Sequence, residues 1–263
     1  MEQEYKLIET EKVTEYFDRE GIEYAVFDLD DTLVDTHTYF KNSIEGAGYL
    51  FLRMSNFQGD MYLDANSIFN HAVNIHKESD TPIEVTEITL RAIERYKKGN
   101  PKLKLPSENN FSIEELITKY QEDFYNESPE IFPDIPDFLY QIYKTGRPIL
   151  IHTNAQEGWT GIKRNAILSE IERNYNEIIP IQYHCTPINR RKNLLAWLEA
   201  EESLQFNFRN SIIFGDNLCT DIYPAIEAGC KNVVHIDRNQ KIKEIEREGY
   251  RTVNRIGNTF LNI

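Results

Sequence analysis

Short apolar runs alternate with amphipathic stretches along most of the chain. Five runs are apolar and long enough to form buried strands, at residues 24–28, 148–153, 179–184, 211–215 and 232–236. Between the last four runs, apolar residues recur at helical spacing, near residues 157–170, 190–200 and 220–228. Strands that alternate with helices are typical of a parallel sheet covered by helices. The pattern therefore predicts an α/β fold with a doubly wound parallel sheet.

The segment between the first two predicted strands breaks this alternation. From Thr36 to Arg147 the pattern predicts helices separated by Pro, Gly and Asn, near residues 38–54, 62–77, 82–98 and 112–126. This segment is too long to be a simple crossover between parallel strands. We therefore predict an all-α cap domain at 36–128, inserted into an α/β catalytic core formed by 1–35 and 129–263. The connections near 34–36 and 130–133 would act as hinges.

Two further helices are predicted in the core. The stretch FPDIPDFLYQIYKTG opens a helix with Pro and Asp and ends it at Gly146. The amphipathic segment 9–20 is closed by Gly21 and is expected to pack on the core. Docking of a partner is the alternative for this segment.

Composition and charge limit the classes of function. The 263 residues are 40% hydrophobic and 27% charged, as in a globular protein. The net charge of −14 repels polyanions, so no nucleic-acid partner is expected. No apolar run approaches the roughly 20 residues that span a bilayer, so no membrane association is expected either. The absence of a signal-like segment and the unpaired spacing of Cys185, Cys219 and Cys230 favour a cytoplasmic protein, either monomer or homodimer.

Carboxylates gather where two of the predicted strands end. In AVFDLDDTLVD, Asp28 and Asp30 follow the first strand, and in IIFGDNLCTD, Asp216 and Asp221 follow the fourth. Ligands of open parallel sheets bind beyond the carboxyl ends of the strands. If these strands are neighbours, the carboxylates repel one another unless a cation lies among them. Mg²⁺ prefers oxygen ligands, so the sequence predicts a magnesium site here.

Four motifs in this order resemble those of the haloacid dehalogenase-like hydrolase superfamily. They are DLDDT after the first strand, ILIHTN at the end of the second, Lys192 before a helix, and GDNLCTD. The helical insertion that follows the first motif is similar to the mobile cap of that family. The resemblance implies a phosphatase of the helical-capped branch, with the cap as a lid that selects the substrate. Tyr39 and Phe40 are the first candidates for lid residues near the substrate, although most aromatic residues of the insertion are expected to pack between helices.

The resemblance also implies roles for individual residues. Asp28 would be the nucleophile and form an aspartyl-phosphate. Asp30 would act as general acid and then as general base, with its pKa, ordinarily about 3.9, raised by neighbouring carboxylates. Thr153, with backbone N–H groups around Asn154, would bind the phosphoryl oxygens, and Lys192 would neutralise their charge.

The implied Mg²⁺ ligands are the carboxylate of Asp28, the backbone carbonyl of Asp30, and Asp216. Asp221 would bind the ion directly or through water. Asp31 and Asp35 are expected to form turns rather than to take part in catalysis. Strand alternation places the side chain of His152 on the face opposite Thr153, where it is expected to be a satisfied core histidine.

Four residues are candidates for the cationic residue of the third motif. The family usually places proline after this lysine, whereas Asn193 follows Lys192. Lys163, Arg190 and Arg191 are the alternatives.

The function implied is that of a Mg²⁺-dependent phosphatase acting on a small phosphorylated metabolite. The alternatives are a phosphomutase or phosphotransferase of the same family, and a catalytically silent binding module with this fold. A dehalogenase is disfavoured, because it needs neither the second acid nor a metal cluster. The identity of the substrate stays open.

Overall fold

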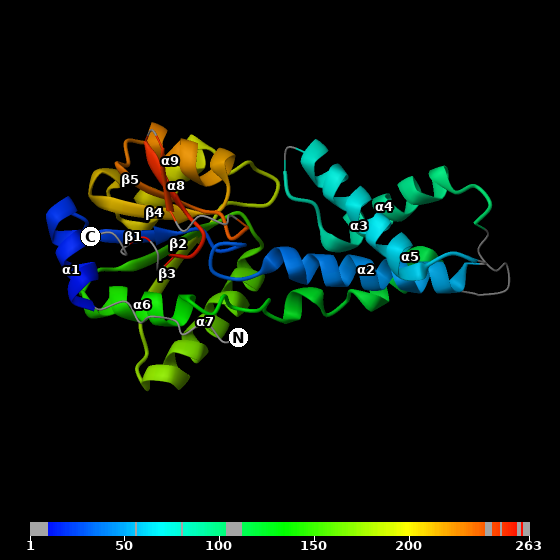
Figure 1. Cartoon of the computed structure of the whole chain (residues 1–263), viewed down its shortest axis with the longest axis horizontal. Helices are drawn as coiled ribbons and strands as arrows, with labels where there is room; N and C mark the ends of the chain where they lie inside the picture. Colours follow the sequence, from blue (N-terminus) through cyan, green and yellow to red (C-terminus); the bar gives the residue numbers. More distant parts are fainter. Residues whose placement is uncertain are drawn as a thin grey trace. The chain divides into compact units, whose positions relative to one another are not determined.

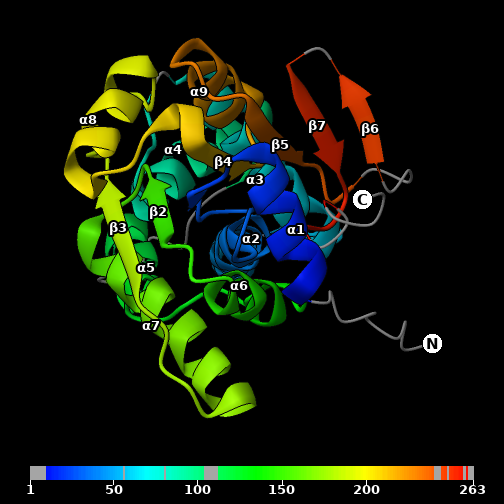
Figure 2. The ribbon, with the colours of Figure 1, turned by 90° about the vertical axis from the view of Figure 1, so that its left-hand side faces the viewer.

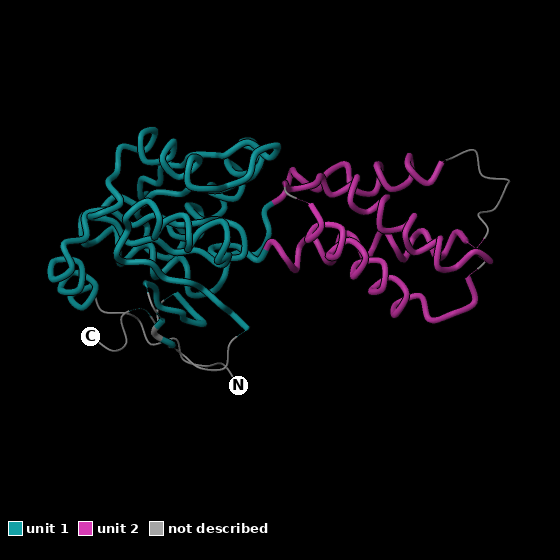
Figure 3. The backbone as a smooth tube through the Cα atoms, turned by 90° about the horizontal axis from the view of Figure 1, so that it is seen from above, with its two compact units in different colours: residues 1–35, 128–263 teal, residues 36–127 magenta. Residues whose placement is uncertain are grey.

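The chain folds into two compact units. The structure is a computed structural model and describes residues 10–55, 57–79, 81–103, 112–239, 244–247, 249–256 and 259. One unit comprises residues 1–35 with 128–263, and the other residues 36–127 (Figure 3). The sequence predicts these limits at 35/36 and 128/129. The second unit is therefore an insertion between two parts of the first.

In its described residues, unit 1 is built on a seven-stranded sheet with the order β3-β2-β1-β4-β5-β7-β6. Strands β1 to β5 are labelled in Figure 1, and β6 and β7 in Figure 2. The first six strands in this order are parallel, and β6 pairs antiparallel with β7 at the edge. The strands are β1 Tyr24–Phe27, β2 Ile149–Thr153, β3 Ile181–Cys185, β4 Ser211–Gly215, β5 Asn232–Ile236, β6 Glu244–Arg247 and β7 Tyr250–Val253. The predicted α/β fold is confirmed.

Alternate residues of the strands face two opposite layers of helices. Ala25 and Phe27 of β1 pack with α1, α6 and α7, whereas Val26 packs with α8 and α9. Figure 2 shows α1 and α6 on one side of the sheet and α8 and α9 on the other. These helices are α1 Thr10–Glu20, α6 Ile135–Lys144, α7 Glu157–Tyr175, α8 Leu194–Leu204 and α9 Tyr223–Glu227. Because both faces are covered, strands β1, β2 and β4 are apolar along most of their length.

Helix α1 packs on the core, as expected for an amphipathic segment. Val13 and Phe17 are fully buried in the same apolar cluster as α6 and β1. Gly21 ends the helix with φ +64°, a left-handed conformation that glycine adopts without strain. Residue 9, where the prediction begins, lies outside the described residues.

Unit 2 consists of helices in its described part. They are α2 Thr36–Met54, α3 Met61–Glu78, α4 Val85–Gly99, α5 Ile113–Tyr120 and a 3₁₀ turn at Phe124–Asn126. Asp60 begins α3 by accepting from two backbone N–H groups, and Ser112 begins α5 with a capping box. Tyr39 and Phe40, the candidate lid residues, both pack against the ring of Phe124 within this unit.

Three details of the predicted elements were wrong. Strands β6 and β7 are missing from the prediction, because the sequence EIEREGYRTV is too polar to show an apolar strand pattern. The helix predicted at 112–126 is interrupted after Tyr120, and the one at 220–228 is a π-helical turn, Leu218–Ile222, followed by α9. In the described part of the chain, every helix is too short or too polar to cross a bilayer.

Three phenylalanines contact one another in the core between α6 and strands β1 and β4. The rings of Phe27 and Phe214 are stacked with centroids 4.7 Å apart, and Phe138 of α6 meets both edge-on. We expect Phe214→Ala to lower the free energy of unfolding by about 3–5 kcal/mol, because it leaves a cavity among fixed neighbours. Urea denaturation measures this change. Ile178→Ala is the control, since Ile178 is exposed, and its effect should stay within about 0.5 kcal/mol.

Candidate active site

The first two predicted site residues lie on the loop that follows β1. The backbone N–H of Asp28 donates to the carbonyl of Phe214 at 2.8 Å, so Asp28 continues the pairing of β1 with β4. Asp31 adopts φ +58° and its N–H donates to the carbonyl of Val34, which turns the chain back. This left-handed turn places Asp30 beside the strand ends. Asp31 therefore forms a turn, as expected.

The end of β2 contributes Thr153 and Asn154. Thr153 is fully buried, and its hydroxyl donates to Oδ2 of Asp30 at 3.4 Å. The side-chain amide of Asn154 donates to the carbonyls of Thr186 and Pro187, at 2.9 and 3.0 Å. Asn154 thereby ties the loop after β2 to the loop after β3. Its side chain is engaged in the fold, which leaves its backbone N–H as the group for a ligand.

The loop after β4 holds the second acidic pair. Asn217 begins the π-helical turn by accepting from the N–H of Cys219, and its own N–H donates to Oδ2 of Asp221 at 3.0 Å. Asp221 is almost fully buried against Gly215. A Cβ at Gly215 would lie only 2.4 Å from the Cβ of Asp221, so this position accepts only glycine without movement.

Lys192 is the cation that contacts two of the predicted acids. Its ammonium donates to Oδ1 of Asp28 at 2.6 Å, to Oδ1 of Asp221 at 2.7 Å and to the carbonyl of His152 at 2.8 Å. The side chain is 2% exposed. All three ammonium protons are therefore used within the protein.

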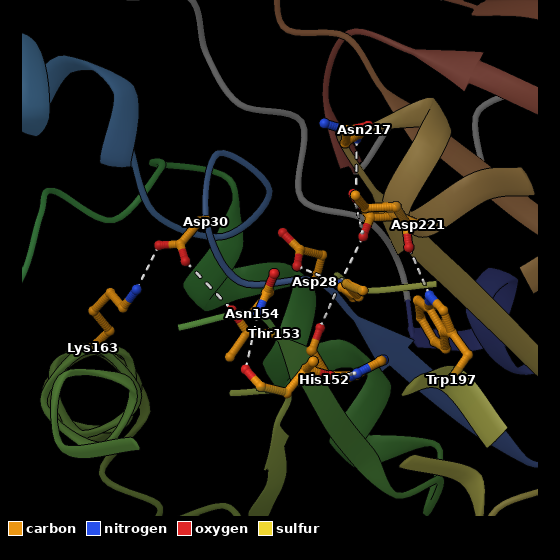
Figure 4. A network of polar contacts seen from close by, with 12 residues as sticks. Asp28, Asp30, His152, Thr153, Asn154, Lys163, Trp197, Asn217 and Asp221 are labelled. Atoms are coloured by element: carbon orange, nitrogen blue, oxygen red, sulfur yellow. Dashed lines mark hydrogen bonds and ion pairs between the residues drawn. The ribbon is translucent and has the colours of Figure 1, made fainter. Parts of the chain in front are cut away.

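Of the three alternatives to Lys192, Lys163 contacts an acid of the site and the two arginines do not. Lys163 of α7 donates to Oδ1 of Asp30 at 2.5 Å, on the other side of Asp28 from Asp221 (Figure 4). Arg190 pairs with Glu199 at the surface, and Arg191 is exposed. The structure therefore brings Lys192 and Lys163 to the acids, and places Arg190 and Arg191 away from them.

Burial and mutual repulsion perturb the acids. Burial raises the pKa of Asp28 to about 8; the ammonium of Lys192 opposes this shift, and the carboxylates of Asp221 and Asp30 add to it. Burial also raises the pKa of Asp216 well above its usual value, with Asp221 and Asp28 adding to the shift. For Lys192, burial alone would lower the pKa, but the carboxylates of Asp221 and Asp28 outweigh it and raise the pKa.

The donor set at the strand ends fits a hard divalent cation. Oxygens of Asp28, Asp216 and Asp221 lie within 4.8 Å of one another. Four carboxylates, counting Asp30, face the ammonium groups of Lys163 and Lys192, which leaves a formal excess of two negative charges. Mg²⁺ takes carboxylate oxygens of this kind, whereas Zn²⁺ favours His and Cys ligands. The residues present therefore fit Mg²⁺.

His152 is buried, as expected, but only partly satisfied. Its Nε2 lies 2.9 Å from the hydroxyl of Thr186, whereas its Nδ1 has no hydrogen-bond partner among the described residues. Burial, then the positive charge of Lys192, lower the pKa of His152 well below its usual value, so the ring stays neutral. The ring packs edge-on against Trp197, with centroids 4.5 Å apart.

Two residues that support the site have no role in the sequence prediction. Gly215 precedes Asp216 directly at a strand end, and an isolated glycine there is a signal of close approach that could have identified it. Trp197 donates from Nε1 to the carbonyl of Thr220 at 2.7 Å, and its ring lies 5.1 Å from the ammonium of Lys192. The sequence carries no signal for this second contact, because it depends on the packing of α8.

Comparisons with known proteins find one family model and several similar solved structures. The family model of the haloacid dehalogenase-like hydrolases matches residues 25–235. A search of curated proteins finds no significant match. Among similar solved structures is the magnesium-bound HAD-hydrolase YfnB from Bacillus subtilis, at 16% identity and TM-score 0.58 over 92% of this chain and 99% of that chain.

Two further solved structures have different activities in their descriptions. One is a 2-haloacid dehalogenase from Pseudomonas syringae pv. Tomato, at 16% identity and TM-score 0.52 over 90% of this chain and 96% of that one. The other is a HAD phosphatase from Thermococcus onnurineus, at 13% identity and TM-score 0.52 over 89% of this chain and 94% of that one. Identities this low show a shared fold and do not distinguish the two activities.

The contact between Gly215 and Asp221 gives a testable prediction. We expect Gly215→Ala to lower the free energy of unfolding by about 1–3 kcal/mol, because the new methyl group overlaps the Cβ of Asp221. Chemical denaturation measures the change. Gly158→Ala in α7 is the matched control, since a Cβ there meets no atom within 4 Å and alanine favours a helix. Equal effects of the two substitutions would contradict the predicted overlap.

Proposed function

Since the chain belongs to the haloacid dehalogenase-like hydrolases, we propose that it is a Mg²⁺-dependent phosphatase for a small phosphorylated metabolite. One observation carries this proposal above all. Asp30, a second acid two residues after Asp28, contacts Thr153 at the end of β2, and Asp28, Asp216 and Asp221 form a cluster of carboxylates that fits Mg²⁺. A dehalogenase of this fold needs neither feature, whereas transfer of a phosphoryl group uses both.

In the proposed first step, Asp28 attacks phosphorus in line with the leaving oxygen. A bond forms between its carboxylate oxygen and phosphorus, and the bond from phosphorus to the leaving oxygen breaks. Asp30 gives its proton to that oxygen, so the leaving group departs as a neutral alcohol. The two residues come from one turn after β1, which fixes their separation.

In the second step, water replaces Asp28 on phosphorus. Asp30, now ionised, takes a proton from the water as it attacks the aspartyl-phosphate. The acyl-phosphate bond breaks at phosphorus, inorganic phosphate leaves, and Asp28 is a carboxylate again. A phosphomutase or phosphotransferase would differ only in the acceptor that replaces water.

Several groups of the protein would offset the negative charge of the phosphoryl group. Lys192 contacts Asp28, so its positive charge lies beside the nucleophile and would offset the negative charge of the incoming phosphoryl group. The hydroxyl of Thr153, which donates to Asp30 in this structure, would turn to the phosphoryl oxygens once they bind, together with the backbone N–H of Asn154 at the end of the neighbouring strand. Preorganised donors of this kind each contribute about 3–4 kcal/mol to stabilising the transition state.

Asp28, Asp216 and Asp221, with the backbone carbonyl of Asp30, would hold Mg²⁺. The ion would neutralise the phosphoryl oxygens and keep the carboxylates ionised. Within the chain, Gly215 and Asn217 hold Asp221 in place for this purpose, through close packing and a backbone hydrogen bond.

We expect Asp28→Asn to reduce turnover of phosphomonoesters on the order of 10³-fold or more while the fold stays intact, because an amide is a poor nucleophile. Release of phosphate from p-nitrophenyl phosphate measures the rate, and circular dichroism the fold. Asp18→Asn is the control, since Asp18 pairs with Arg147 at the surface and should be neutral. A large residual rate in a pure preparation of Asp28→Asn would exclude this residue as the nucleophile.

Removal of metal should abolish phosphatase activity, and Mg²⁺ should restore it. Zn²⁺ and Ca²⁺ should support little activity, because Zn²⁺ favours other ligands and Ca²⁺ is larger with looser coordination. Assays after exhaustive chelation and dialysis against each ion test this. Halide release from 2-haloacids that persists after chelation, without phosphatase activity, would instead identify a dehalogenase. Binding of a phosphorylated metabolite with no turnover would identify a silent binding module.

A further inference from the structure

Lys163 is a buried lysine whose charge meets the proposed acid–base residue. Its side chain is 0% exposed, and its ammonium lies 2.5 Å from Oδ1 of Asp30. The same nitrogen lies 3.8 Å from the ring centroid of Trp159, one turn earlier on α7. An ammonium group in a protein interior is unfavourable unless it is paired and hydrogen-bonded. The burial of Lys163 therefore requires the contact with Asp30.

The two lysines of the site divide the carboxylates between them. Lys192 holds Asp28 and Asp221, whereas Lys163 holds Asp30. Figure 4 shows Asp30 and Lys163 on one side of Asp28, and Asp221 on the other. The side chain of Asp30 is thus directed toward α7 and away from the cluster that fits the metal. This direction suits a carboxyl group that must protonate the leaving oxygen rather than bind the cation.

The exposures of the two partners differ. The side chain of Asp30 is 27% exposed, while that of Lys163 is completely covered. In this pair, solvent reaches the carboxylate of Asp30 but not the ammonium of Lys163. Buried ion pairs often add little to stability compared with apolar residues of the same size. A charged residue in this core position is better explained by its effect on the accessible carboxylate.

We infer that Lys163 is the positioning residue of Asp30. From its fixed place on α7 it holds one carboxylate oxygen, while the hydroxyl of Thr153 lies 3.4 Å from the other. The direction of the carboxylate is then set by the β2–α7 segment as well as by the turn that carries it. Lys163 touches no substrate in this assignment and exchanges no proton. The inference rests on the proposed phosphatase activity, in which Asp30 is the acid and the base.

The test compares two aryl phosphates that differ in their need for an acid. Lys163→Met keeps an unbranched side chain and removes the ammonium. We expect kcat/KM for phenyl phosphate to fall about 10- to 100-fold, because a misdirected acid protonates the leaving oxygen poorly. The loss for p-nitrophenyl phosphate should be several-fold smaller, since its leaving group departs readily without a proton.

Ile167→Ala is the matched control. Ile167 lies one turn beyond Lys163 on the buried face of α7, so its truncation disturbs the same packing without touching Asp30. It should change the rates for both aryl phosphates by a common factor. If Lys163→Met, shown to be folded, also slowed both substrates equally, Lys163 would be a structural residue and the inference would be wrong.

A second measurement is independent of turnover. Without the ammonium, the carboxylate of Asp30 is left beside an apolar side chain, so adding Asp30→Asn to Lys163→Met should raise the unfolding temperature, by about 2–4 °C. Additive losses in the double variant would show that the residues are not a pair and would overturn the inference. If the wild type releases no phosphate from any phosphomonoester while this rescue is observed, the proposed function fails and the pairing stands.

Discussion

The fold brings four carboxylates to one edge of a sheet, and the site depends on how their charge is compensated. Like charges a few ångströms apart cannot all ionise unless positive charge lies among them. Lys192 bridges Asp28 and Asp221, and Lys163 pairs with Asp30. Both lysines are almost completely covered, whereas Asp30 is partly exposed. Loss of the carboxylates would leave a buried positive charge, which is far less favourable than the intact pairs.

Strand order explains why the acids meet. The chain passes from β1 to β2 and β3 on one side of the sheet, and then crosses β1 to form β4 on the other side. At such a reversal the loops after the two central strands part and leave space beyond their carboxyl ends. Asp28 follows β1 and Asp216 follows β4, so the reversal lies between them. The acids are therefore neighbours because of topology, although nearly 190 residues separate them in the sequence.

Much of this could be predicted from the sequence, because the acids follow apolar runs and strand ends of a parallel sheet share one edge. The lysine that pairs with each acid could not be predicted, since sequence spacing alone does not distinguish Lys163 from Lys192. A signal for Lys163 did exist. It occupies the buried face of α7 with Trp159, Ile167 and Ile171, where helical periodicity calls for an apolar residue. A lysine at such a position is rarely buried without a partner. Strands β6 and β7 offered no comparable signal, because their residues are mostly polar.

The carboxylates differ in how many hydrogen bonds they accept from the protein, and this difference identifies the one that a ligand can engage. Asp221 accepts from Lys192 on one oxygen and from the N–H of Asn217 on the other. Asp28 accepts from Lys192 on one oxygen. No hydrogen bond to the carboxylate of Asp216 occurs within the described part of the chain, yet this group lies within 4.8 Å of the other two. Lys192 has no proton left to offer Asp216, so within the described residues the carboxylate of Asp216 is the one that a ligand can still engage. This carboxylate lies beside Asp28, where the proposed reaction brings a phosphoryl group.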